Sequence, residues 1–363
     1  MAASARALSP ALPQPPAALR PATAPQPGFH PERLLVIDPL TRRFGDYQIA
    51  ELPALLGLGD ALVVNDAATV PASLQVDAGL ELRLVSWEED ESFRAVVFGA
   101  GDFRQPTEAR AAPRRLLRGE QLRFTSELSA TVVDVDTSEP RLVRLRFHSS
   151  GAALWRGLYR HGKPIQYAHA AAPWPLWDVQ NRYAARPWAF ELPSAGRPLT
   201  FELLFELEER GASLTHVTHA AGISSTGSPS LDARLPFPER YEVGTEAARV
   251  IARARRAGGR VIAAGTSVVR ALETQAAPGG LVHAGSGETD LRVSRFYTPR
   301  VVDGLLTGLH EEGTSHFELL EAFAPRALLL RALGHAARTG YLQHEFGDSC
   351  LILAGSLLAP LAA

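Results

Sequence analysis

The periodicity of hydrophobic residues changes twice along this chain, and this change restricts the possible folds more than any other feature. From about residue 73 to residue 150, apolar and polar residues alternate in short, β-branched runs that turn-rich segments separate. The clearest runs cover residues 81–85, 93–98, 131–135 and 142–147. Because no helical pattern interrupts them, these runs predict a small antiparallel β-barrel or sandwich.

The sequence on both sides of this block follows a different pattern, in which strands alternate with helices. Buried-strand patterns cover residues 32–38, 61–65, 260–264 and 351–353, and helical patterns cover residues 49–56, 245–257, 268–275, 315–324 and 325–338. Strand, tight turn and helix in succession is typical of α/β proteins. We therefore expect an α/β fold in which residues 31–72 and 151–363 form the main domain and residues 73–150 form an inserted β-barrel domain.

Residues 1–30 are rich in alanine and proline and are predicted to form a disordered tail, since such a segment buries too little apolar surface to fold. Pro10, Pro13, Pro15 and Pro16 interrupt the apolar stretch that a secretory signal requires. The chain has no run of 18 apolar residues, so we expect no contact with a membrane.

Charge and cysteine content narrow the functional classes further. The net charge is −2, so the chain lacks the basic surface of proteins that wrap duplex DNA, and any RNA contact must be a local patch. Lys163 is the only lysine; the other positive charges belong to arginine, which suits phosphates and stacked bases. The single cysteine, Cys350, indicates a reducing compartment, the cytoplasm. Its apolar neighbours predict a buried side chain rather than a reactive thiol.

Gly265, Thr266 and Ser267 join a predicted strand to a predicted helix. Small residues at this place let the backbone approach a ligand, and N–H groups at the start of a helix attract anions and carboxylates. An ordinary turn in which a serine caps the helix explains the same residues equally well. Arg270 and Glu273 lie three residues apart on the following helix, a spacing that is usual for a solvated ion pair.

Residues 303–316 form a second segment with groups that carry chemistry, including Asp303, Thr307 and His310. A histidine has the near-neutral intrinsic pKa that suits a general base, although a lone histidine is more often structural. His310 and His316 are six residues apart, which is not the spacing of a zinc pair, and we expect no metal site.

The third segment, residues 345–348, places an acid after a glycine, where it either orients a ligand or closes a turn. No Gly-x-Gly-x-x-Gly fingerprint follows a strand, which argues against a dinucleotide or methyltransferase site, and no Gly-x-Ser-x-Gly elbow is present. Residues 285–290 (GSGETD) lack the Lys-Ser/Thr ending of a nucleotide loop. Spacing alone thus predicts one α/β ligand site near residues 265–273, 303–316 and 345–348.

The same segments, in the same order, resemble the S-adenosylmethionine:tRNA ribosyltransferase-isomerase family of queuosine biosynthesis. Residues 260–273 (RVIAAGTSVVRALE) are similar to the family's R-V-I-A-V-G-T-T-x-V-R-x-L-E signature. The other matches are residues 287–291 (GETDL) with G-x-T-D-L, residues 301–307 (VVDGLLT) with V-V-D-x-L-x-T, His310 with the histidine of N-F-H-x-P, residues 346–348 (FGD) with Y-G-D, Asn65 with the start of N-N-T-R-V-x-P-A-R-L, and residues 193–196 (PSAG) with P-T-A-G. The likeness covers roughly residues 33–355.

This resemblance implies transfer and isomerisation of the ribosyl part of S-adenosylmethionine onto 7-aminomethyl-7-deazaguanine in tRNA. The product is epoxyqueuosine, and adenine and methionine leave. S-adenosylmethionine is then a co-substrate, and no cofactor is implied. We expect His310 to transfer a proton; Gly265, Thr266 and Ser267 to hold the methionine carboxylate or the ribose; and Asp303 and Asp348 to orient the amine or hydroxyl groups. The further residues of the matched motifs that we assign to the substrate site are Arg270, Glu273, Thr307, Gly347 and Asn65.

The chain departs from the family pattern at positions where the family has arginine or histidine. Ala68 and Ser73 stand in place of two arginines, and Pro198 and Ala220 stand in place of two histidines. Such groups hold phosphates or move protons. Two alternatives therefore stay open: an enzyme that uses S-adenosylmethionine on a small molecule, and a non-catalytic relative that binds a nucleoside or RNA.

Overall fold

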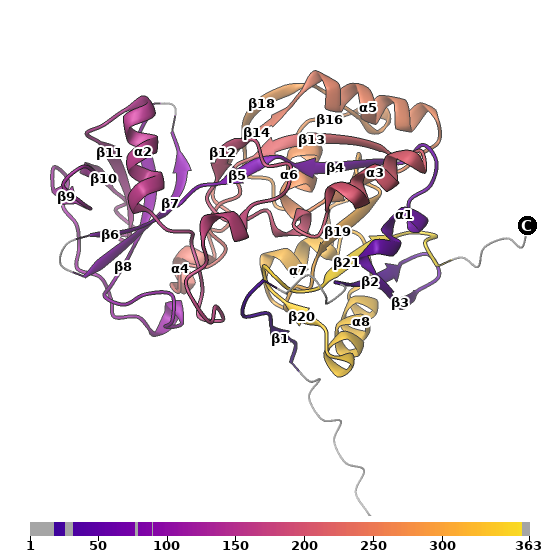
Figure 1. The fold of residues 1–363 in the computed structure, drawn as a ribbon, viewed down its shortest axis with the longest axis horizontal. Helices are drawn as coiled ribbons and strands as arrows, with labels where there is room; N and C mark the ends of the chain where they lie inside the picture. Colours follow the sequence, from indigo (N-terminus) through magenta and orange to yellow (C-terminus); the bar gives the residue numbers. More distant parts are fainter. Residues whose placement is uncertain (1–17, 26–31, 77–78, 89, 358–363) are drawn as a thin grey trace, which may run out of the picture.

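The computed structural model describes residues 18–25, 32–76, 79–88 and 90–357, which form two bodies that lie side by side (Figure 1). The larger body contains a nine-stranded sheet with strand order β18-β14-β13-β4-β15-β19-β21-β2-β3. Strands β13, β4, β15 and β19 run parallel to one another, and β21 runs antiparallel to β19. The strands of this sheet are β2 (Arg33–Asp38), β3 (Arg43–Gln48), β4 (Ala61–Asn65), β13 (Ser213–His219), β14 (Glu239–Val243), β15 (Val261–Ala264), β18 (Gly285–Thr289), β19 (Gly304–Gly308) and β21 (Ser349–Leu353).

Helices cover both faces of this sheet because alternate residues of its strands are buried on opposite sides. Leu35 and Val63 pack with α5, α6, α7 and α8 on one face, whereas Leu34 and Leu62 pack with α1 and α3 on the other. A sheet with helices on both faces is the layered α/β architecture. The helices of the larger body are α1 (Leu52–Leu55), α3 (Phe201–Glu209), α4 (Pro229–Asp232), α5 (Thr245–Arg256), α6 (Thr266–Thr274), α7 (Ser315–Leu320) and α8 (Arg326–Thr339).

The smaller body is a six-stranded antiparallel, barrel-like sheet with strand order β6-β7-β8-β11-β10-β9. Its strands are β6 (Ser73–Val76), β7 (Leu80–Trp87), β8 (Phe93–Phe98), β9 (Gln121–Arg123), β10 (Ser129–Val135) and β11 (Leu142–Phe147). Leu154 and Leu158 of α2 (Gly151–His161) belong to the same apolar core. The predicted fold class, an α/β protein with a small antiparallel β-barrel, is confirmed.

The strands and helices predicted in the larger body are present, with shifted ends. The helix predicted over residues 268–275 begins earlier, at Thr266, so Thr266 and Ser267 lie in its first turn. Strands β3, β13, β14 and β19 were not predicted, and β18 occupies the segment that we compared with a nucleotide loop. The remaining short strands are β1 (Arg20–Pro21) with β20 (Leu342–Gln343), β5 (Ala67–Thr69) with β12 (Arg186–Ala189), and β16 (Ala276–Ala277) with β17 (Leu281–Val282).

Part of the segment predicted as a disordered tail has a defined structure. Residues 1–17 and 26–31 lie outside the described residues, but Arg20 and Pro21 pair with β20, and Ala22 packs against Trp174 and Phe346. For residues 18–25 the prediction is wrong, because a sheet edge and an apolar cluster far along the chain bind a segment that cannot fold alone. Cys350 is buried, as predicted. In the described part of the chain, no helix is both long and apolar enough to cross a membrane.

Candidate active site

The candidate site lies at the carboxyl edge of the four parallel strands. Strands β4, β13 and β15 end there at Asn65, His219 and Ala264, and β19 ends at Gly308. In open α/β sheets, ligands bind in the crevice outside the carboxyl ends of the strands. Segments that are far apart in the sequence meet at this edge because the strands that precede them are neighbours in the sheet.

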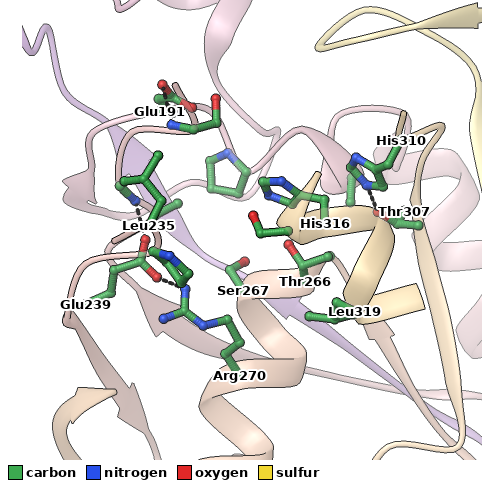
Figure 2. Close-up of a pocket in the computed structure, with 18 of the residues that line it drawn as sticks. Glu191, Leu235, Glu239, Thr266, Ser267, Arg270, Thr307, His310, His316 and Leu319 are labelled. Atoms are coloured by element: carbon green, nitrogen blue, oxygen red, sulfur yellow. Dashed lines mark hydrogen bonds and ion pairs between the residues drawn. The ribbon is translucent and has the colours of Figure 1, made fainter. Parts of the chain in front are cut away.

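Two adjoining hollows open at this edge. The first is formed by the β15–α6 turn and by segments after β12, β13 and β19, and the second extends from it towards β20 with a volume of about 490 Å³. That volume falls within the range of about 300–1,000 Å³ that is usual for small-molecule sites. Both hollows are lined by Glu191, Leu192, Ser194, Ser224, Leu235, His310, Ser315 and His316. Because they share these walls, we treat them as one candidate active site (Figure 2).

The β15–α6 turn forms one wall of the first hollow. Gly265 precedes the helix with a φ of 107°, in the left-handed region that glycine tolerates best. Thr266 and Ser267 line the hollow from the first turn of α6, where backbone N–H groups lack partners within the helix and attract negative charge. This arrangement suits a carboxylate or a ribose hydroxyl, as we expected for these residues.

Asn65 fastens this turn to the sheet. Its side-chain Nδ2 donates hydrogen bonds to the His219 carbonyl (3.0 Å) and to Ser267 Oγ (3.3 Å). Its Oδ1 accepts from the backbone N–H groups of His219 (2.9 Å) and Ala67 (3.1 Å). Asn65 is buried and is not among the lining residues, so it contacts the site through Ser267.

Arg270 is not the solvated partner of Glu273. It is buried, forms an ion pair with Glu239, and donates a hydrogen bond from Nε to the Leu291 carbonyl (3.0 Å). Glu239 Oε1 also accepts from the backbone N–H of Gly222 (2.7 Å). Arg270 and Glu239 both line the first hollow, so this pair joins α6, β14 and the segment after β13 into one charged wall.

Glu273 points away from the hollow and holds a loop. Its carboxylate accepts hydrogen bonds from the backbone N–H groups of Arg300, Val301 and Val302 (2.9–3.0 Å) and from the Tyr297 hydroxyl (3.0 Å). Its side chain is fully buried and takes no part in the lining. The expected substrate-binding position of Glu273 is therefore wrong, since the side chain is occupied by the loop before β19.

Thr307, at the end of β19, and His310, just after it, also line the first hollow. Thr307 Oγ1 and His310 Nε2 are 2.8 Å apart, and the ring of His316 stacks on that of His310 with centroids 4.9 Å apart. Burial, together with His316 and His344 nearby, holds the pKa of His310 well below its usual value. His310 is therefore neutral near pH 7. It can accept a proton, but only weakly.

Asp303 and Asp348 do not line either hollow. Asp303 precedes β19 and so lies at the opposite edge of the sheet, where its carboxylate accepts from Val261 N (2.7 Å) and pairs with Arg255 (2.8 Å). Asp348 is buried and accepts from the backbone N–H groups of Arg33 (3.0 Å) and Leu342 (2.8 Å). The expectation that residues 265–273, 303–316 and 345–348 form one ligand site is wrong for Asp303 and Asp348, because both carboxylates hold neighbouring backbone.

Gly347 also has a structural explanation. A Cβ atom there would lie 2.6 Å from the Leu342 carbonyl oxygen, so the turn before β21 requires a glycine. Of the residues that the sequence assigned to the site, six line the first hollow: Gly265, Thr266, Ser267, Arg270, Thr307 and His310.

Three polar residues near the hollows, of which Glu239 and His219 are buried and Glu191 is partly buried, were not identified from the sequence. Glu191 lines both hollows, Glu239 lines the first, and His219 lies behind Glu239 with its Nε2 3.4 Å from Glu239 Oε2. Burial lowers the pKa of His219 to about 4, so the ring is neutral at pH 7. Glu191 stands two residues before the PSAG segment and His219 next to Ala220, which are the signals that could have indicated them.

One cluster at the edge of the second hollow has the composition of a metal site, and two of its three residues, His344 and Glu345, line that hollow. The ligand atoms of His169, His344 and Glu345 lie within 4.8 Å of one another. The two imidazole rings are stacked, with centroids 4.1 Å apart and planes 7° apart, while His169 Nε2 is 2.6 Å from Glu345 Oε2. A metal ion must lie near the plane of each imidazole that binds it, and stacked rings share no such position. The arrangement fits a histidine–carboxylate pair better than a metal centre.

Comparison with known proteins identifies the family. The sequence profile of the family described as "Queuosine biosynthesis protein" matches residues 11–352. A protein of Methylocella silvestris named S-adenosylmethionine:tRNA ribosyltransferase-isomerase is 34% identical over 94% of this chain and 95% of that protein. Proteins of the same name from Parvibaculum lavamentivorans and Gloeobacter violaceus are 31% and 33% identical, each over 89% of this chain and over 93% and 90% of their own lengths.

A solved structure shares the fold. The S-adenosylmethionine tRNA ribosyltransferase of Thermotoga maritima superposes with a TM-score of 0.50, at 24% identity, over 92% of this chain and 96% of that one. The profile and the relatives both span nearly the full chain, including both bodies. The chain therefore belongs to the queuosine biosynthesis protein family.

Proposed function

We propose that this protein is an S-adenosylmethionine:tRNA ribosyltransferase-isomerase. It transfers and isomerises the ribosyl part of S-adenosylmethionine onto 7-aminomethyl-7-deazaguanine in tRNA, giving epoxyqueuosine, adenine and methionine. The observation that carries the proposal is the hollow at the carboxyl edge of the parallel strands, where hydroxyl and charged side chains and the β15–α6 turn face Thr307 and His310. The names of the full-length relatives support the same reaction.

The chemistry of the walls suits a sulfonium substrate. The first turn of α6, with Thr266 and Ser267, offers donors to the methionine carboxylate or a ribose hydroxyl. Glu191 and Glu239 bring negative charge near the cationic sulfur. The sulfonium acidifies the neighbouring 5′ carbon and is a good leaving group, so the protein has to supply a base and a site shielded from water. S-adenosylmethionine acts here as a co-substrate, and no resident cofactor is required.

The partner and the location follow from the reaction. tRNA is the macromolecular substrate, bound through a local surface, and DNA is not a partner because the net charge of −2 gives no general affinity for duplexes. We place the reaction in the cytoplasm, which fits the single buried Cys350.

A product assay tests the proposal. The full chain is incubated with S-adenosylmethionine and tRNA that carries 7-aminomethyl-7-deazaguanine, and small molecules and digested tRNA are analysed by mass spectrometry. We expect adenine and methionine in equal amounts and a tRNA nucleoside with the added ribosyl mass. S-adenosylhomocysteine would indicate methyl transfer instead, and adenine release without change in the tRNA would indicate a small-molecule acceptor. Either result would contradict the proposal.

A further inference from the structure

Glu191 is a partly buried acid that lines both hollows, and the reaction proposed above uses it only as a negative charge near the sulfonium. It follows β12 in a segment that is fastened to the segment after β13, since the Phe190 N–H donates to the Ala221 carbonyl (2.8 Å). In Figure 2 it lies on the other side of the hollow from Thr307. A rigid backbone on both sides therefore presents this carboxyl group to the space where a ligand would sit.

The hydrogen bonds of Glu191 leave one oxygen free for a ligand. Oε1 accepts from the Tyr167 hydroxyl and from the backbone N–H of Ser224 (3.2 Å). For Oε2 the described residues supply no hydrogen-bond donor. The two donors stabilise the carboxylate and fix its orientation, and Oε2 remains available to accept a proton.

The charged and titratable groups around Glu191 set its proton affinity. Burial raises the pKa of Glu191 to about 7; the hydrogen bonds from Tyr167 and Ser224 oppose the increase, and Glu345 adds to it. Arg83 faces Tyr167 from the β-barrel, with its guanidinium carbon 5.2 Å from the ring centroid. A group that titrates near the working pH is the most effective general base. His310, whose pKa is strongly lowered, is a much weaker one.

We propose that Glu191 is the proton-transfer residue of this site and that Tyr167 positions it; this inference rests on the proposed function. Glu191 Oε2 takes the proton from the 5′ carbon of S-adenosylmethionine, and the C–H electron pair stays on that carbon beside the sulfonium. The carboxylic acid then gives the proton to a nitrogen of adenine as the glycosidic bond breaks, with the bond's electron pair leaving on adenine. The carboxylate is restored, so no external acid or base is consumed.

The test measures adenine release by the full chain, with the same tRNA, as kcat/KM for S-adenosylmethionine between pH 5.5 and 9. For the unaltered protein we expect the rate to rise with pH and to level off above a midpoint near 7, since kcat/KM reports the free protein's base. Glu191→Gln should lower kcat/KM about 100-fold or more, because general base catalysis contributes about 10²–10⁴-fold. It should also lose the rise of the rate with pH, which we call the pH limb. Glu209→Gln, on the exposed end of α3, serves as the control and should change nothing.

A second variant separates catalysis from structure. Tyr167→Phe removes a donor to the carboxylate, so the limb should move to higher pH while a measurable rate remains. Glu191→Gln could fail to fold or fail to bind S-adenosylmethionine in calorimetry, and Glu191→Asp then replaces it in the test. We expect Glu191→Asp to react more slowly and to keep the pH limb, because it still carries a carboxylate. Full turnover by Glu191→Gln, an unchanged limb in Tyr167→Phe, or loss of the limb in Glu191→Asp would each overturn the inference. An unaltered protein that releases no adenine would refute the proposed function itself.

Discussion

Single buried polar residues hold the loops around the candidate site in place through hydrogen bonds. Glu273 is the clearest example. It lies on α6, beside residues of the hollow, yet it accepts four hydrogen bonds from the loop before β19. We expect Glu273→Gln to lower the free energy of unfolding by about 2–4 kcal/mol, because charge-assisted bonds to buried donors are lost. Urea denaturation measures the change, with the exposed Glu209→Gln as a matched control. Equal stability of the two variants would contradict this role.

His219 makes stability depend on pH in a predictable direction. Its pKa is about 4 in the folded protein and about 6.5 in an unfolded chain, so the unfolded state binds a proton first as the pH falls. The stability associated with neutral His219 is complete above pH 6.5 and is lost as the pH falls towards 4. Between pH 8 and pH 5 the loss amounts to about 2 kcal/mol.

The test compares the unaltered protein with His219→Gln, whose side chain does not titrate. Denaturation curves at pH 8 and pH 5 give the loss of stability for each protein, and the unaltered protein should lose more by about 2 kcal/mol. The difference between the two losses isolates His219 from the carboxylates that titrate in both proteins. No difference would mean that the His219 ring is accessible to protons in the folded state.

At the scale of elements, the β15–α6 turn depends on one backbone conformation. Gly265 has a φ of 107°, and an added Cβ would contact Ala195 at 3.4 Å. We expect Gly265→Ala to cost about 1–2 kcal/mol of stability and to weaken S-adenosylmethionine binding, because strain at this residue shifts the first turn of α6. Calorimetry measures binding. Gly244→Ala, before α5 at a φ of −72° and with nothing within 4 Å, should leave affinity unchanged.

At the scale of the whole molecule, an apolar cluster joins the two bodies. Val85, Phe98 and Leu142 of the six-stranded sheet pack with Leu231 and Phe237 of the larger body. Leu235, which lines both hollows, belongs to the same cluster. Part of the site wall therefore depends on how the β-barrel packs against the α/β body.

Breaking this cluster should weaken the coupling between the bodies. Leu231→Ala leaves a cavity at a fully buried position and should cost about 2–5 kcal/mol. We expect circular dichroism and tryptophan fluorescence to give one shared urea midpoint for the unaltered protein and separate midpoints for this variant. Leu58→Ala, at a side chain that is 86% exposed, should keep a single transition. If the two midpoints still coincide in Leu231→Ala, the two bodies unfold together without this contact, and the cluster does not couple them.

Local patterns in the sequence were sufficient for the elements and for part of the site. Alternating and helical periods depend on neighbouring residues, so they predicted β7, β8, α5 and α8 with only small errors at the ends. Thr266 and Ser267 could be found because they follow the carboxyl end of a strand that the pattern predicts, and His310 because it matches the histidine of a family motif. Strand β13 gave no comparable local signal, and the signal for Glu191 was only its position two residues before the PSAG segment.

The amino-acid sequence alone determined the class of fold, the family and the turn that begins α6, because each of these is encoded in contiguous residues. The tertiary structure alone decided which polar side chains face the hollow. Asp303 and Thr307 are four residues apart in one motif, yet β19 carries them to opposite edges of the sheet. Glu191 and His310 are far apart in the chain and yet line the same two hollows. Burial and contact depend on how the strands are ordered in space, which no local pattern records.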